Sequence, residues 1–235
     1  MDASEKISHD YFAHRGFKSI VYEPDGNIPP DLLLDESIAV EVRRLNQNYF
    51  DAAGAQGLEQ VAIPLWNKVK ALLTSMGPPS SGESWFVHFR YGRPVEAWKA
   101  LEPKLCAGLS SFMGSSRKGR VIVASGQGFE LEVFCRTSNP HASMFVMSGC
   151  SDEQSGGWLL SEMETNIRYC ASEKARKIAR VRPKYSTWWL ALVDHIGYGL
   201  DDFDREMFRE QVSIQHSWDK IILIDPRDHA RAFEI

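Results

Sequence analysis

The sequence predicts a mixed α/β fold, in which a central mixed sheet is flanked by helices and carries an α+β insertion. Short apolar runs near the N-terminus are separated by turn residues, as in paired strands. Beyond residue 158, helical and strand patterns alternate, which is typical of a sheet covered by helices. Between these parts lies a long segment with its own strands and helices. We therefore assign residues 1–46 and 158–235 to a core and residues 47–157 to an inserted region.

The N-terminal part is expected to form a helix and three short strands. The helix runs from Ser4 to Arg15, with its apolar residues at helical spacing. A strand from Lys18 to Tyr22 follows, and the turn residues Asp25-Gly26-Asn27 end it. The apolar runs Leu32–Leu34 and Ile38–Val42 then predict a hairpin, because only three polar residues separate them.

Two acids of this hairpin are the main candidates for chemistry. Side chains alternate along a strand, so Glu41 and Arg43 point to the same face. A tight hairpin brings Asp31 near Glu41, and two such carboxylates repel each other unless a cation lies between them. Oxygen ligands of this kind suit Mg²⁺ or Mn²⁺. The alternative is a solvated cross-strand face without a ligand.

Pro30-Asp31 followed by Glu41-Val42-Arg43 resembles the motif of the PD-(D/E)XK phosphodiesterase superfamily. That motif has an acid after proline, then a spacer, then an acid, any residue and a lysine. Arg43 stands in place of the lysine, and it holds a cation but does not readily lose its proton. The family core runs helix, three strands, helix, strand, and the expected elements have this order. The resemblance implies a restriction-endonuclease-like core.

The resemblance also implies roles for single residues. Asp31, Glu41 and the carbonyl of Val42 would hold Mg²⁺ or Mn²⁺. Glu5 lies on the first helix, where many family members carry a third acid, and it would position a metal or a water. Arg43 would stabilise negative charge on the scissile phosphate.

A second candidate lies in the helical run from Leu159 to Lys184. Apolar residues recur there at three- and four-residue spacing, and Lys174 interrupts the stripe. Snorkelling of its ammonium to water is the simpler explanation. The resemblance suggests another, because in several branches of the family this helix supplies the lysine that the third strand lacks; Lys177 is the fallback. Glu173 and Lys177 could instead form an exposed ion pair.

The same helical run is basic. From Arg168 to Lys184 there are seven Lys or Arg residues and one acid, whereas the whole chain has a formal net charge of -4. An acidic chain argues against a free-standing, non-specific DNA-binding protein, but one basic face is compatible with an enzyme that grips a nucleic-acid backbone. A salt-bridged surface helix is the alternative. The candidate nucleic-acid contacts are Arg168, Arg176, Lys177, Arg180, Arg182 and Lys184.

The C-terminal part returns to strands. Trp188–Val193 and Lys220–Ile224 read as buried strands, with a helix from Asp201 to Val212 between them. Asp194 and His195 stand at the end of the first strand, where they serve either a site or, more simply, a chain reversal.

The inserted region is expected to be an α+β unit with two helices and four strands. The helices are Leu58–Met76 and Val95–Phe112, and the strands are Trp85–Tyr91, Arg120–Ala124, Phe129–Phe134 and Ser143–Met147.

Composition limits the class of protein. At 235 residues, 43% hydrophobic and 25% charged, the chain is long enough for one large domain or two small ones. No apolar run approaches the roughly 18 residues that span a bilayer, and the N-terminus lacks a signal-peptide core, so we expect a cytoplasmic protein without a membrane partner.

The expected function is that of a metal-dependent phosphodiesterase, a nuclease acting on nucleic acid. The alternative is a catalytically inactive protein with the nuclease fold that serves nucleic-acid binding or protein assembly. A third hypothesis is a structural partner whose seven tryptophans pack a core or an interface.

Overall fold

The computed structural model describes residues 1–235, except residues 53, 80–81, 116–118 and 138–140 and the side chain of residue 135. The chain divides into two compact units. Unit 1 comprises Met1–Asn48 and Gly156–Ile235, and unit 2 comprises Tyr49–Ser155. The sequence placed the two junctions after residues 46 and 157, close to these positions.

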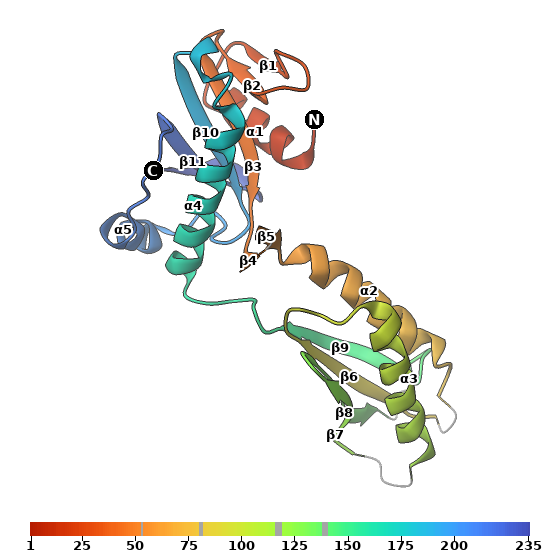
Figure 1. Ribbon diagram of the computed structural model, residues 1–235. Coiled ribbons are helices and arrows are strands. Elements are labelled where there is room, and N and C mark those ends of the chain that lie inside the picture. The colour runs from red at the N-terminus through yellow and green to blue at the C-terminus, as the bar shows by residue number, and fades with distance from the viewer. Residues whose placement is uncertain (53, 80–81, 116–118, 138–140) are drawn as a thin grey trace. The chain divides into compact units, whose positions relative to one another are not determined.

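Unit 1 is built on a mixed sheet with the strand order β1-β2-β3-β10-β11-β12 (Figure 1). The first three strands form an antiparallel meander, β10 is parallel to both β3 and β11, and β12 is antiparallel to β11. The strands are β1 (Ile20–Tyr22), β2 (Leu32–Leu34), β3 (Ile38–Leu45), β10 (Thr187–Asp194), β11 (Lys220–Asp225) and β12 (Asp228–Glu234).

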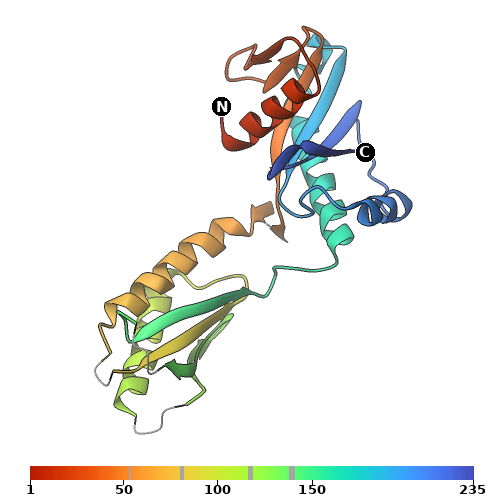
Figure 2. The same ribbon diagram turned by 180° about the vertical axis from the view of Figure 1, so that it is seen from behind.

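Helices cover both faces of this sheet. One face packs against α4 (Leu159–Ile178) and α5 (Asp202–Gln211), and the other packs against α1 (Ala3–His14), as Figures 1 and 2 show from opposite sides. This arrangement confirms the expected mixed α/β class with a central mixed sheet flanked by helices.

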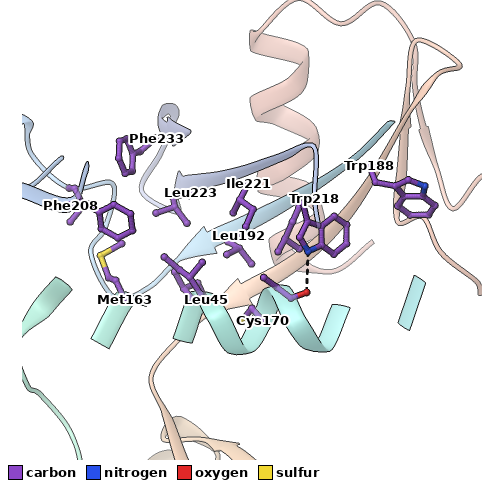
Figure 3. Packing of buried hydrophobic residues seen from close by; sticks show 14 of the residues in the cluster. Leu45, Met163, Cys170, Trp188, Leu192, Phe208, Trp218, Ile221, Leu223 and Phe233 are labelled. Atoms are coloured by element: carbon purple, nitrogen blue, oxygen red, sulfur yellow. Dashed lines mark hydrogen bonds between the residues drawn. The ribbon is translucent and has the colours of Figure 1, made fainter. Parts of the chain in front are cut away.

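The larger core of unit 1 lies between the sheet and α4. Figure 3 shows Leu192, Ile221 and Leu223 from the central strands packing toward the helix. The buried Trp218 joins them, and its indole nitrogen donates a hydrogen bond of 3.1 Å to the Ala171 carbonyl. The side chains on β3 alternate accordingly, because Ala39 faces α4 whereas Val40 and Val42 face α1.

Helix α4 is shorter than the run of helical spacing in the sequence. It ends at Ile178, and a 3₁₀-helix, η1 (Arg182–Lys184), follows it. Pro183 lies at the start of this 3₁₀-helix and has no backbone N–H to donate, so the α-helix does not continue through it.

Unit 2 is an α+β unit with a sheet of its own. Its strand order is β7-β8-β6-β9, in which β6 is antiparallel to β8 and parallel to β9. Both helices pack on the core of this sheet. The elements are α2 (Glu59–Ser75), β6 (Ser84–Tyr91), α3 (Trp98–Gly114), β7 (Val121–Gly126), β8 (Phe129–Thr137) and β9 (Phe145–Asp152).

A two-stranded hairpin, β4 (Asn48–Asp51) and β5 (Gly54–Gly57), precedes α2. The sequence analysis missed this hairpin and the edge strand β12. Both are largely exposed, so neither gives the buried, alternating pattern from which strands are predicted. No helix among the described residues is long and apolar enough to cross a membrane.

Candidate functional site

The β2–β3 hairpin brings Asp31 and Glu41 together. Leu32 pairs with Val40, and continuing this antiparallel register places Asp31 opposite Glu41. Directly opposed residues point to the same face of a sheet. The backbone N–H of Val42 donates a hydrogen bond of 2.7 Å to Asp31 Oδ2, which fixes one carboxylate oxygen against β3. Because the N–H and C=O of one strand residue point to the same side, the Val42 carbonyl also faces the β2 side.

Glu41 is a completely buried acid, with 0% of its surface exposed. Its Oε2 accepts hydrogen bonds from Lys174 Nζ at 2.7 Å and from Lys177 Nζ at 3.4 Å. Its Oε1 is buried and has no hydrogen-bond partner among the described residues. Burial raises the pKa of the Glu41 carboxyl, and the Lys174 ammonium only partly opposes that effect. Oε1 has therefore lost its hydration without gaining a hydrogen bond from the described residues.

Helix α4 supplies the cations. Lys174 lies among the buried residues of α4 and is itself 8% exposed. Its ammonium does not snorkel to water, because Nζ lies 2.7 Å from Glu41 Oε2 and 3.6 Å from Asp31 Oδ2. Burial disfavours the charged lysine, yet the attraction of Glu41 and Asp31 outweighs it and raises the pKa of Lys174. The simpler explanation given for Lys174 from the sequence is therefore wrong.

Arg43 lies on the same face of β3 as Glu41 and contacts Tyr169 and Glu173 of α4. Its guanidinium forms an ion pair with Glu173 and lies over the Tyr169 ring, 5.1 Å from the ring centroid. The expected ion pair between Glu173 and Lys177 is replaced, since Glu173 binds Arg43 and Lys177 binds Glu41. Arg43 thus links β3 to α4 next to Lys174. The sequence analysis missed this contact, because the partners are far apart in the chain.

Glu5 takes part in the N-terminal cap of α1. The Asp2 side chain accepts a hydrogen bond from the Glu5 N–H at 2.9 Å, and Glu5 Oε2 accepts one from the Asp2 N–H at 2.5 Å. Its carboxylate also lies near Tyr22, where it adds to the effect of Glu23 in raising the pKa of the phenol. Within the described residues, neither a hydrogen bond nor an ion pair joins Glu5 to Asp31 or Glu41.

A metal site with three protein side chains is not preformed here. In the part of the chain that the structure describes, no group of three or more His, Cys, Asp and Glu side chains could hold a metal ion. The donors that do converge are the carboxylates of Asp31 and Glu41, which share Lys174 as a partner. Hard oxygen donors of this kind fit Mg²⁺, which keeps several waters and needs few protein ligands. The unpartnered Glu41 Oε1 is the observation that supports such a fit.

The basic residues after Arg168 are only partly available to a ligand. Arg168 donates to the Ser213 carbonyl at 2.8 Å, Arg182 donates to the Ser217 carbonyl, and Lys184 binds Asp25. These three side chains hold neighbouring segments of unit 1. Of the remaining candidates, Lys177 lies beside Glu41 and the exposed Arg176 precedes it on α4, whereas the exposed Arg180 follows the end of that helix.

Asp194 organises a loop at the end of β10. It is 0% exposed and accepts hydrogen bonds from the backbone N–H groups of Ile196, Gly197 and Gly199, at 2.9, 2.8 and 3.2 Å. This confirms the simpler alternative for Asp194, a chain reversal.

Comparisons with protein-family models, curated proteins and solved structures give no match to this chain.

Proposed function

We propose that the protein is a metal-dependent phosphodiesterase of the PD-(D/E)XK type that acts on nucleic acid. The observation that carries the proposal is the convergence of Asp31 and the buried Glu41 from the hairpin with Lys174 from α4. Glu41 retains a buried oxygen without a partner, and Asp31 uses one oxygen to bind the Val42 N–H. A divalent cation would satisfy both carboxylates at once.

The order of elements supports the same proposal. Helix α1, the antiparallel strands β1 to β3, helix α4 and the strand β10, parallel to β3, follow one another as helix, three strands, helix, strand. Unit 2 enters between β3 and α4, so it interrupts this order without changing it. We therefore propose that unit 1 has the restriction-endonuclease-like core.

Each residue of the site would have a distinct task. Asp31, Glu41 and the Val42 carbonyl would hold Mg²⁺ or Mn²⁺. When bound, the metal would lower the pKa of a coordinated water and neutralise charge on the scissile phosphate. Lys174 would stabilise the negative charge that develops on that phosphate. Arg43 would act on Lys174 by fixing α4 against β3, rather than by contacting the phosphate. Glu5 would stay with the N-terminal cap of α1.

The substrate backbone would pass along the exposed cations of α4. Arg176 and Lys177 follow Lys174 on this helix, and Arg180 lies just beyond its end at Ile178. Cations near a phosphodiester backbone supply affinity that falls with rising salt.

A second candidate function rests on a specific observation. Lys174 and Lys177 already neutralise Glu41 without a metal, and Arg43, which occupies the motif lysine position, is bound to Glu173. An inactive protein with the nuclease fold, serving nucleic-acid binding or protein assembly, would keep this pairing permanently.

One experiment separates the two functions. Cleavage of single- and double-stranded DNA and RNA is measured with Mg²⁺, with Mn²⁺ and with EDTA, for the wild type, Asp31→Asn and Glu41→Gln. Metal-dependent cleavage that both variants lose supports the phosphodiesterase. Nucleic-acid binding without cleavage in any condition supports the inactive protein.

A further inference from the structure

Unit 2 contains a pocket of about 350 Å³, which is within the usual range for small-ligand sites. It lies between α2, the β4–β5 hairpin and the segment that joins β6 to α3. Tyr49, Gln56, Lys68, Arg93 and Trp98 line it, together with several apolar residues and two acids. None of these residues belongs to the Asp31–Glu41 site, and the function proposed above does not use them.

Two aromatic rings border the pocket, and each has a cation beside it. Lys68 Nζ lies 5.8 Å from the centroid of the Trp98 ring, and the Arg93 guanidinium lies 5.9 Å from that of Tyr49. Lys68 is exposed and forms no ion pair within the described residues. Proteins use aromatic rings to stack a nucleobase and neighbouring Lys or Arg side chains to bind its phosphate.

Arg93 gives the pocket a fixed wall. Its side chain is 2% exposed, and Nη1 binds Asp152 at 2.5 Å while Nη2 donates to the Leu58 carbonyl at 3.0 Å. The Arg93 Nε donor is buried and has no partner among the residues that the structure describes. A buried donor without a partner is costly, and an acceptor that reached it would relieve that cost.

Glu96, the lining acid closest to Trp98 in the chain, is already paired. Glu96 is bound by Lys104, with both carboxylate oxygens within 2.8 Å of the ammonium. Helix α3 begins at Trp98 without a side-chain cap, so the positive end of its dipole also faces this region. With Arg93 balanced by Asp152, the exposed Lys68 is the cation left to meet an anion at the Trp98 end.

We propose that this pocket binds a nucleotide unit. The base would lie against Trp98 and Tyr49, and the Gln56 amide would form hydrogen bonds with the polar edge of the base. The phosphate would bind Lys68 of α2, close to the N-terminus of α3. The same chemistry is offered by a free mononucleotide and by a nucleotide within a single strand. The experiment therefore includes both sources.

Binding is measured by calorimetry on the full chain in EDTA, with adenosine 5′-monophosphate and with a single-stranded oligonucleotide of deoxythymidine as probes. Loss of a stacked base or of a phosphate contact costs about 1.4 kcal/mol, so Trp98→Ala and Lys68→Gln should each weaken binding about tenfold. Lys70→Gln, an exposed lysine of the same helix that does not line the pocket, should leave the affinity unchanged. Trp98→Phe, which keeps a ring, should retain most of it and guards against misfolding of the alanine variant.

Two outcomes overturn the proposal. One is the absence of saturable binding by either probe to the wild type. The other is binding that folded Lys68→Gln and Trp98→Ala variants retain in full. Binding of the mononucleotide identifies a free ligand, and binding of the oligonucleotide alone identifies a single strand; either supports the pocket. Binding to the pocket is measured in EDTA, whereas the phosphodiesterase is measured as metal-dependent cleavage, so failure of the pocket and failure of the phosphodiesterase are distinguished.

Discussion

Two buried acids on neighbouring parallel strands, Glu41 on β3 and Asp194 on β10, have opposite surroundings. Both are 0% exposed. The three backbone N–H groups around Asp194 occupy both of its oxygens. Glu41 meets two lysine side chains at one oxygen and no partner at the other, within the described residues. A carboxylate held by the backbone is fixed in the fold, whereas one held by side chains can exchange its partners.

The pKa values do not distinguish these two acids. Burial raises the pKa of Asp194, with the N–H groups of its loop only partly opposing it, and burial raises that of Glu41 as well. The difference lies in what a cation could do at each position. Each acid has a second carboxylate near it, Asp31 for Glu41 and Asp225 for Asp194. Among the described residues, only Glu41 of the two has a buried oxygen without a hydrogen-bond partner. This difference supports the proposed chemistry at Glu41 and a structural role for Asp194.

The largest expected effect is on catalysis by Glu41→Gln. The amide keeps the shape of the side chain but removes the charge that would hold the metal. Loss of several kcal/mol of charge stabilisation corresponds to about a thousandfold slower metal-dependent cleavage. Asp194→Asn, a matched change at an equally buried acid, should leave cleavage per folded molecule unchanged. Equal losses of cleavage in the two variants would contradict the proposed difference in role between Glu41 and Asp194.

The next effect is on stability and concerns Asp194→Ala. Removal of this carboxylate leaves the N–H groups of Ile196, Gly197 and Gly199 without an acceptor in a partly buried loop. We expect the free energy of unfolding to fall by about 3 kcal/mol, because each unsatisfied group costs roughly 1 kcal/mol or more. Denaturant titration gives this value. An unchanged unfolding midpoint would show that the loop does not depend on Asp194.

Lys174→Met separates the two effects expected at the Glu41 site, metal binding and cleavage. Its ammonium lies between Glu41 and Asp31, so a divalent cation must compete with it. The variant should bind Mn²⁺ more tightly and yet cleave about a hundredfold more slowly, because the cation near the phosphate is lost. Mn²⁺ titration and single-turnover cleavage measure the two quantities. Weaker Mn²⁺ binding would mean that Lys174 positions the acids instead of competing for them.

The smallest effect is expected at Arg43. Its ion pair with Glu173 and its contact with Tyr169 hold α4 against β3. Arg43→Gln should slow cleavage about tenfold through displacement of Lys174, whereas Arg43→Lys should restore most of the rate by keeping the ion pair. A matched loss with Glu173→Gln, and no further loss in the double variant, would identify one shared contact. Additive losses would place Arg43 at the phosphate.

Local patterns predicted much of the fold and one half of the site. The two-residue period of the hairpin was enough to place Asp31 beside Glu41. The apolar stripe singled out Lys174 but favoured snorkelling, and only the family resemblance suggested a place beside the two acids. The contact between Arg43 and Glu173 depends on how α4 sits on β3, which no local pattern contains. The same holds for Arg182 and Lys184, whose place in a basic run gave no sign that they bind Ser217 and Asp25.

The central claim is that the Asp31–Glu41 pair is a metal-activated phosphodiesterase site. The most direct test is Mn²⁺-dependent cleavage of single- and double-stranded nucleic acid by the wild type, Glu41→Gln and Asp194→Asn in one assay. We predict cleavage by the wild type and Asp194→Asn that EDTA abolishes, and none by Glu41→Gln. Cleavage by Glu41→Gln at the wild-type rate, or no cleavage by the wild type on any of these substrates, would contradict the claim.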